Sequence, residues 1–543
     1  MSSAKKDDRS YTGEHTHTSE PDFGTVEAYS HGDEMDRQNK RPMEYDEGEG
    51  GDGYSPAAAY GVENVMPRTK STLNLLLISI IIMSVPYGVG TTFFYSLIQG
   101  GPLTVIWCWF IMSFISLCIA ASLGEIASRY PTSGGVYYWS YMMSTPKYRA
   151  LTSYVVGWLS LCGNIIVTLT ANFGTTQLIL ASVNLYYPDY LPKPWHTVLT
   201  SWGLIIVVGT IAILGQKALP KVDGFMIVWI TAGVLATAIT LPVKAASGTR
   251  SAAEVFTIWQ DQGAGWPRGW SFVMALIQGA YCFSPIGMLA SMADEMKTPE
   301  TSVPIAMVGG VAVNSIFGIV FLLPILFTAG DIGAALLSPT GQPLPALYLQ
   351  ATGGNAAAFG LFFIVLLNGV ACGLACSQVS SRCTWAFARD GAIPGSKYLA
   401  RVSQRHQMPV NAFLLCVVVQ VLLSCLYFGS SAAFNAFISV AVICLGTSYV
   451  IPVIISVARG RDRLVGAKFY LGRRFGMFCN VITIAWYVFA IPLLSFPTTI
   501  PVLANTMNYA AAVYIGFAVL AIVWYLTWGK SHFRGPPELA QIM

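Results

Sequence analysis

Charged side chains are scarce in this sequence: Asp, Glu, Lys and Arg make up 11% of the 543 residues, whereas 54% are hydrophobic. Soluble globular chains carry about a quarter of charged residues. The composition therefore excludes an ordinary soluble domain and predicts a polytopic membrane protein in contact with a lipid bilayer. We expect no nucleic-acid partner.

The usual ingredients of a catalytic or metal site are also missing. The six histidines fall in predicted tails or loops, and the 11 cysteines show no Cys-x-x-Cys spacing. Since an integral membrane enzyme needs such groups clustered at depth, we expect no enzymatic activity, no catalytic residue, no metal and no cofactor. The cysteines are interpreted as small packing residues between helices.

Carboxylates are absent from the predicted membrane midplane. Outside the first 70 residues there are twelve Asp and Glu, all in loops or near predicted helix ends. A proton pump built on intramembrane carboxylates is therefore disfavoured. The polar residues at depth are amides and hydroxyls, and Asn164 and Asn368 lie closest to mid-depth. Each is a candidate substrate contact, with hydrogen bonding between helices as the alternative.

Residues 1–70 have a different composition from the rest. They carry eight Lys or Arg against fifteen Asp or Glu and show no apolar periodicity. This pattern predicts a disordered acidic cytosolic tail without a cleavable signal peptide. The tail is either a plain solvating segment or a regulatory one, with Lys5 and Lys6 as modification sites for regulatory or ubiquitin machinery.

Apolar runs follow one another from Leu75 onwards. A membrane-spanning helix needs about 20 apolar residues. This rule predicts twelve helices within a transporter domain at 71–530, followed by a short cytosolic C-terminal tail at 531–543. The predicted helices are 73–99, 103–128, 149–183, 195–214, 222–242, 269–296, 303–328, 356–386, 410–428, 432–457, 474–496 and 508–528.

The distribution of Lys and Arg predicts the orientation. With a cytosolic N-terminus, the inner loops and the C-terminal tail hold 19 Lys or Arg and the outer loops hold four. Cytosolic loops of membrane proteins carry the excess of positive charge. Both termini are therefore expected in the cytosol.

Two predicted helices contain a Pro-x-Gly break: Pro86-x-Gly88 in the first helix and Pro285-x-Gly287 in the sixth. Proline removes a backbone donor and glycine adds freedom, so a helix should open at each site. Broken helices at corresponding positions of two halves indicate the binding site of a secondary transporter. Because the repeat length is five helices, the pattern predicts a 5+5 inverted repeat (helices 1–5 and 6–10) with helices 11 and 12 peripheral. A simple kink at each site is the alternative.

Three loop motifs resemble those of the amino acid–polyamine–organocation transporters. They are Glu125-Ile-Ala-Ser-Arg129-Tyr-Pro131-Thr-Ser-Gly134-Gly135-Val-Tyr137, Met292-Ala-Asp294-Glu295 with Pro299 and Pro304, and Ala388-Arg389-Asp390-Gly391-Ala-Ile-Pro394. Their order is that of the superfamily, and the likeness covers about residues 70–530. The sequence most resembles the fungal amino acid/choline transporter branch. The resemblance implies an all-α, leucine-transporter-type fold, a plasma membrane location and usually proton-driven uptake.

The resemblance and the two breaks together imply a permease that imports a small amine-containing solute by alternating access. An amino acid or γ-aminobutyrate is favoured, and choline, another quaternary amine or a polyamine is the alternative. A nutrient receptor that binds without transporting is a further alternative, supported by the long tail. Proton is the expected coupling ion, but the residues do not assign it, since helix 5 lacks the lysine that some proton-coupled relatives carry at depth.

The expected substrate site consists of the residues around the breaks and the two mid-depth amides. Opened helix ends offer amides to a carboxylate and carbonyls to a cation, and tyrosine faces attract an ammonium. The expected substrate-binding residues are Ser84, Pro86, Tyr87, Gly88, Gly90, Asn164, Tyr281, Phe283, Ser284, Pro285, Gly287 and Asn368. The expected gating residues form two ion pairs, Glu125 with Arg129 and Arg389 with Asp390, with permanent loop staples as the alternative.

Overall fold

The structure is a computed structural model that describes residues 68–429, 432–503, 507–533 and 535–536. Within these residues, twelve helices are long and apolar enough to cross a membrane. The same residues contain no β-strand, only two isolated bridges. The prediction of an all-α protein with twelve spans is therefore confirmed. Residues 1–67, which include Lys5 and Lys6, lie outside the described part.

The elements follow the predicted order, with several short helices in the loops. They are α2 (Thr72–Met83), α3 (Val85–Gly100), α4 (Pro102–Arg129), α5 (Gly135–Met143), α6 (Arg149–Tyr186), α7 (Pro194–Leu214), α8 (Leu219–Lys244), α9 (Ala252–Phe256), α10 (Arg268–Met274), α11 (Ile277–Phe283), η1 (Ser284–Glu295), α12 (Pro299–Phe327), α13 (Ile332–Leu336), α14 (Pro343–Thr352), α15 (Asn355–Arg389), α16 (Ser396–Leu399), α17 (Val410–Ser424), η2 (Cys425–Phe428), α18 (Ala432–Ala458), η3 (Asp462–Leu464), α19 (Arg473–Leu493), α20 (Ala510–Trp524), η4 (Tyr525–Gly529) and α21 (Lys530–His532).

The most buried spans are those at Thr72–Gly100, Arg149–Tyr186, Arg268–Glu295 and Ala436–Ala458. They correspond to the predicted first, third, sixth and tenth helices. A helix that is apolar on all sides belongs either inside a bundle or in lipid. The span at Ala510–His532, the predicted twelfth helix, is the least buried.

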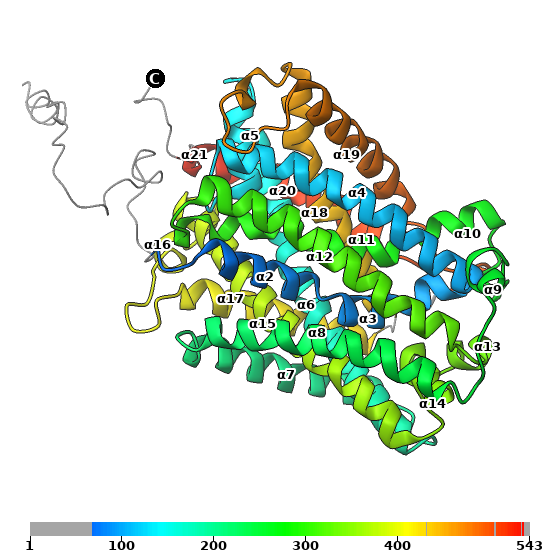
Figure 1. The fold of residues 1–543 in the computed structure, drawn as a ribbon. Coiled ribbons are helices and arrows are strands. Elements are labelled where there is room, and N and C mark those ends of the chain that lie inside the picture. Colours follow the sequence, from blue (N-terminus) through cyan, green and yellow to red (C-terminus); the bar gives the residue numbers. More distant parts are fainter. Residues whose placement is uncertain (1–67, 430–431, 504–506, 534, 537–543) are drawn as a thin grey trace, which may run out of the picture. The chain divides into compact units, whose positions relative to one another are not determined.

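Helix α12 packs against α2, α4 and α8, and these elements lie side by side in Figure 1. Helix α6 packs against α15 and α18, and α19 packs against α4 and α18. The interrupted first span therefore contacts helices from both halves of the chain. This arrangement places its break in the interior, where protein groups satisfy the backbone polar atoms that lipid would leave unpaired.

The Gly134-Gly135 pair after the second span predicts a tight turn, with the aromatic residues Tyr137 and Trp139 that follow it at the membrane interface. Gly135 does adopt a positive φ of 52°, but the residues that follow form α5. Tyr137 and Trp139 are buried in the protein, with exposed fractions of 1% and 0%.

Candidate functional site

The first span is interrupted at a single residue, Ser84. Helix α2 ends at Met83 and α3 begins at Val85, while Ser84 has φ 19° and ψ 76°. The Ser84 carbonyl accepts the amide N–H groups of Tyr87 at 3.0 Å and Gly88 at 2.8 Å. The break therefore lies just before Pro86, which occupies the first turn of α3, where a missing N–H costs nothing.

The sixth span tightens where it was expected to open. Helix α11 ends at Phe283, and the chain continues as the 3₁₀-helix η1 from Ser284 to Glu295. The expectation of opened backbone at Pro285 is wrong for this conformation, because i to i+3 hydrogen bonds satisfy the groups that an open helix would expose. A 3₁₀ run of this length inside a helix is uncommon and often marks a hinge.

A small cavity of about 10 Å³ lies between the two interruptions. We call it the central cavity. Its lining consists of Ile82, Met83, Tyr87, Gly88, Val167, Ala171, Tyr281, Cys282, Pro285, Cys372 and Cys376. This volume holds about one water molecule. The structure is therefore a conformation in which the central cavity is closed.

The two tyrosines of the central cavity are fixed by α6. The Tyr87 hydroxyl donates to the carbonyl of Ala171 at 2.7 Å, and the Tyr281 hydroxyl donates to Thr170 Oγ1 at 3.1 Å. These bonds leave the ring faces for contact with a ligand. None of the lining residues named above carries a charged side chain, so recognition of a cation there depends on ring faces and backbone carbonyls.

Four of the expected substrate contacts meet at this cavity: Tyr87, Gly88, Tyr281 and Pro285. The sequence reasoning missed the three thiols that line it with them. Cys372 donates its S–H to the Ile82 carbonyl at 3.2 Å, near the C-terminal end of α2. Two features of the sequence could have identified these thiols. Cys372 and Cys376 have i, i+4 spacing, and Cys282 lies beside a Pro-x-Gly break.

The remaining expected residues at the breaks face neighbouring helices. A Cβ at Gly287 would lie 2.4 Å from the Tyr449 ring, and the Tyr449 hydroxyl donates to the Ser284 carbonyl at 3.0 Å. Gly287 was expected to admit a substrate carboxylate, but in this conformation the Tyr449 ring fills that space. Phe283 packs on Trp109, with ring centroids 5.2 Å apart.

Gly90 also serves helix packing. A Cβ there would lie 3.1 Å from Val365 and 3.2 Å from Leu344. These side chains come from α15 and α14, so the glycine allows those elements to approach α3 closely.

The two mid-depth asparagines lie outside the lining of the central cavity. Asn164 donates to Cys383 Sγ at 2.9 Å and to Ser160 Oγ at 3.3 Å. Asn368 is fully buried, and its side-chain oxygen and nitrogen have no hydrogen-bond partner among the residues that the structure describes. A buried unpaired amide is costly. Asn368 therefore remains a candidate for a contact that forms in another conformation.

One of the two expected gating pairs is wrong. Glu125 pairs with Arg461, whose Nη2 lies 2.5 Å from Glu125 Oε2, rather than with Arg129. Both side chains are almost fully buried, and the Leu471 amide also donates to Glu125 Oε1 at 3.2 Å. Arg129 instead donates its Nε–H to the Arg463 carbonyl at 3.2 Å. The Glu125–Arg461 pair thus joins α4 to the loop between α18 and α19.

The second expected pair is present within a larger network. Arg389 Nε lies 3.2 Å from Asp390 Oδ1. Arg389 Nη1 lies 3.1 Å from Oδ2 of Asp294, a residue near the end of η1. Tyr137 donates to Asp390 at 2.7 Å, and Ser133 donates to Asp294. Burial raises the pKa of Asp390 while Arg389 opposes that shift, and burial also raises the pKa of the Tyr137 phenol. Tyr137 therefore stays protonated and keeps donating at neutral pH.

A third ion-pair cluster was not expected from the sequence. Glu295, at the end of η1, pairs with Lys70 at 3.2 Å and with Arg382 of α15. The Lys70 amide N–H also donates to the Glu295 carbonyl at 3.1 Å. Lys70 was assigned to the end of the predicted tail, yet it ties the start of the first span to the sixth. The sequence feature that could have indicated this cluster is Arg382, a single arginine within an apolar run.

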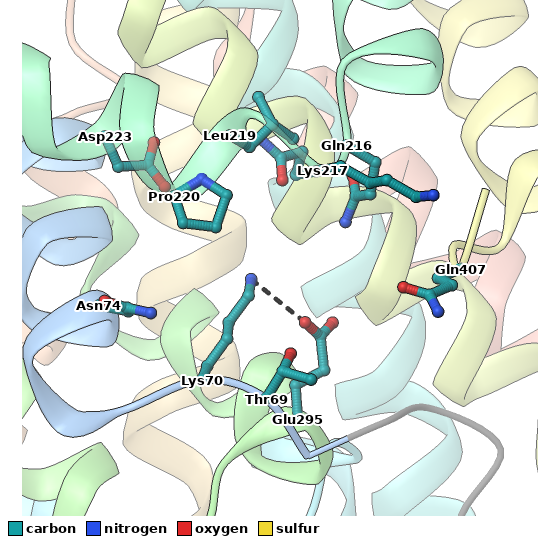
Figure 2. Close-up of a pocket in the computed structure, with 11 residues that line it drawn as sticks. Thr69, Lys70, Asn74, Gln216, Lys217, Leu219, Pro220, Asp223, Glu295 and Gln407 are labelled. Carbon is teal, nitrogen blue, oxygen red and sulfur yellow. Dashed lines mark ion pairs between the residues drawn. The ribbon is translucent and has the colours of Figure 1, made fainter.

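This cluster borders a second cavity of about 390 Å³, which we call the inner cavity (Figure 2). Its lining consists of Thr69, Lys70, Asn74, Gln216, Lys217, Leu219, Pro220, Asp223, Glu295, Gln378 and Gln407. In contrast to the central cavity, most of these side chains are polar or charged. Burial lowers the pKa of the Lys70 ammonium, and the attraction of Glu295 opposes this shift.

Comparison with known proteins gives a consistent match across the bundle. A family model described as amino acid permease matches residues 73–518. A choline transporter of Saccharomyces cerevisiae is 30% identical over 453 residues, which cover 83% of this chain and 80% of the relative.

Two further relatives carry other substrate names. An amino-acid permease of Arabidopsis thaliana is 30% identical, with 88% of this chain and 94% of the relative covered. A polyamine transporter of Saccharomyces cerevisiae is 28% identical, with 84% and 74% covered.

Proposed function

The chain belongs to the amino acid permease family, and on this premise we propose that it imports a small amine-containing solute by alternating access. We favour an amino acid or γ-aminobutyrate as the substrate and proton as the coupling ion. The observation that carries the proposal is the central cavity, where Tyr87 and Gly88 of the first span meet Tyr281 and Pro285 of the sixth. Substrate sites of secondary transporters form between interrupted helices of this kind.

The proposed cycle requires the central cavity to enlarge, because its volume of about 10 Å³ excludes any amino acid. Helix α2 is bounded by the break at Ser84 and by Lys70, which is held to Glu295. Release of Lys70 would allow α2 to pivot at Ser84 and open the cavity on the side of the N-terminus. We propose that this side is cytosolic and that the membrane is the plasma membrane.

Choline or another quaternary amine is a second candidate, favoured by a specific feature of the lining. The lining of the central cavity offers two tyrosine rings and no carboxylate. Each ring face stabilises a cation by about 0.5–2 kcal/mol. A choline transporter is also among the relatives. The receptor alternative rests on the acidic tail, which lies outside the described residues.

Uptake into vesicles that contain the purified protein tests the proposal. Labelled γ-aminobutyrate, an amino acid mixture, choline and putrescine are compared at pH 5.5 and pH 7.5, with each compound competing against the others. We expect saturable uptake of γ-aminobutyrate or an amino acid that is faster at the lower outside pH. Uptake of choline alone favours the second candidate, and binding without uptake contradicts the transport proposal.

A further inference from the structure

The inner cavity already holds an ammonium group. Lys70 Nζ lies 3.2 Å from Glu295 Oε2, and Asp223 of α8 forms part of the opposite wall (Figure 2). Glu295 also pairs with Arg382, and Lys217 is a further cation in the lining, so two carboxylates face three cations, one of which is Lys70 itself. Burial and the repulsion of Arg382 lower the pKa of the Lys70 ammonium, and the attraction of Glu295, with a smaller one from Asp223, opposes this shift in part. The two carboxylates of the walls therefore stabilise an ammonium that has left water.

Several acceptors in the inner cavity have no partner. Within the described residues, Asp223 forms no ion pair or hydrogen bond, and Gln216 Oε1 is buried without a donor. Gln378 is 6% exposed, and no hydrogen bond of its side-chain amide exists among these residues either. Buried polar atoms are almost always paired, so Gln216 Oε1 calls for a donor that the described residues do not supply, while the half-buried Asp223 is a carboxylate accessible from the cavity. A ligand that donates hydrogen bonds would satisfy them.

The volume fits a small solute. About 390 Å³ lies within the range of small-molecule sites, which begins near 300 Å³. The walls come from separate parts of the chain, namely the segment before α2, the start of α8, the end of η1 and α15. A ligand here would contact each of the elements that Lys70 and Glu295 hold together.

We propose that the inner cavity is an ammonium-binding site, which Lys70 occupies in this conformation and which accepts the primary ammonium of a small solute when Lys70 leaves. A primary ammonium has three N–H donors for Glu295, Asp223 and Gln216. A quaternary ammonium has none, so the site discriminates between these classes. That the natural ligand is an amine passing from the central cavity rests on the proposed function, whereas binding itself does not.

Ligand-induced stabilisation of the purified, detergent-solubilised Lys70→Ala variant tests this site. The substitution removes three methylene groups and the ammonium of the lysine side chain. The probe n-propylammonium has the same three carbons and ammonium and can replace them. Because a ligand that binds only the folded state raises the unfolding midpoint, we expect n-propylammonium to raise it by about 2 °C or more in a saturable manner. Propyltrimethylammonium and 1-propanol, added at equal concentration, should produce no such shift.

Three proteins serve as matched controls. The wild type should show a much smaller shift, since its own Lys70 ammonium already pairs with Glu295. Lys468→Ala removes an exposed lysine paired with Glu300 and should show none. In Lys70→Ala combined with Asp223→Asn, the shift should fall by at least half. An absent shift in folded Lys70→Ala, or an equal shift with propyltrimethylammonium, overturns the proposal.

A second measurement uses the wild type and does not depend on the folding of a variant. Cys372 and Cys376 are buried in the central cavity and report its opening. We expect n-propylammonium, by competing with Lys70, to accelerate their alkylation at least twofold, as followed by mass spectrometry. No acceleration, or equal acceleration by the quaternary analogue, contradicts the proposal. Failure of uptake with intact amine binding would instead reject only the proposed function.

Discussion

At the scale of single residues, the protein keeps its carboxylates away from the central cavity. Tyr87 and Tyr281 provide rings there, with both hydroxyls bonded to α6. Asp223 and Glu295 lie at the inner cavity, beside Lys70. The reason is energetic, because an unpaired charge inside the membrane is expensive and ring faces are not. Recognition of a cation at mid-depth therefore relies on aromatic faces and carbonyls.

Substitution of Gly287 by Ala tests the packing role of that residue. The new Cβ would lie 2.4 Å from the Tyr449 ring. Overpacking of this kind costs about 1–3 kcal/mol. We expect a lower unfolding midpoint and strongly reduced uptake. Gly203→Ala is the control, since nothing lies within 4 Å of that position. Equal behaviour of the two alanine variants would exclude the packing role.

At the scale of elements, ion pairs connect helices that are distant in sequence. Lys70 and Glu295 join the start of the first span to the end of the sixth, and Arg382 adds α15. Glu125 and Arg461 join α4 to the loop before α19. The first cluster borders a cavity and can respond to a ligand, while the second is fully enclosed. We infer that the Glu125–Arg461 pair stays formed throughout the transport cycle and holds α4 to the loop before α19.

The two arginines near Glu125 give a direct test of this assignment. Removing one member of a buried ion pair costs about 3–5 kcal/mol, because the other charge is left unpaired. Arg461→Gln should therefore lower the unfolding midpoint strongly. Arg129→Gln should change stability by less than about 1 kcal/mol, since it loses one bond to a backbone carbonyl. Thermal unfolding of both variants in detergent provides the measurement. A larger loss with Arg129→Gln would contradict the observed pairing.

At the scale of the whole molecule, the twelve candidate spans of the described residues would, if each crosses the bilayer, place both ends of the bundle on one side of the membrane. The excess of Lys and Arg on that side favours the cytosol. In this proposed orientation, the inner cavity and its Lys70–Glu295 pair would face the cytosol. The central cavity would then release its solute through the inner cavity during import.

Epitope tags at the two termini test this orientation. In intact cells that express the tagged protein, we expect neither tag to be accessible to antibody until the plasma membrane is permeabilised. A tag inserted after Gly248, in the loop between α8 and α9, is the control and should be accessible from outside. Labelling of either terminus in intact cells would reverse the proposed direction of release.

The sequence by itself determined the helices and the two places where they are interrupted. Each apolar run of about 20 residues must form a helix in lipid, because the backbone has no other way to pair its polar groups. The Pro-x-Gly motifs marked both interruptions for the same local reason. The pattern of residues alone therefore placed Tyr87, Gly88, Tyr281 and Pro285 among the twelve expected site residues, and these four line one cavity in the structure.

Only the tertiary structure decided which distant side chains meet. Glu125 has a local candidate in Arg129, yet its partner Arg461 is 336 residues away. An ion pair forms where two charged groups are close in space. The number of residues between them predicts that distance only within a few helical turns. The form of the sixth span also depended on packing, since Tyr449 fills the space beside Gly287 and holds the Ser284 carbonyl. The inner cavity exists only because Lys70, Asp223 and Glu295, from separate elements, converge on it.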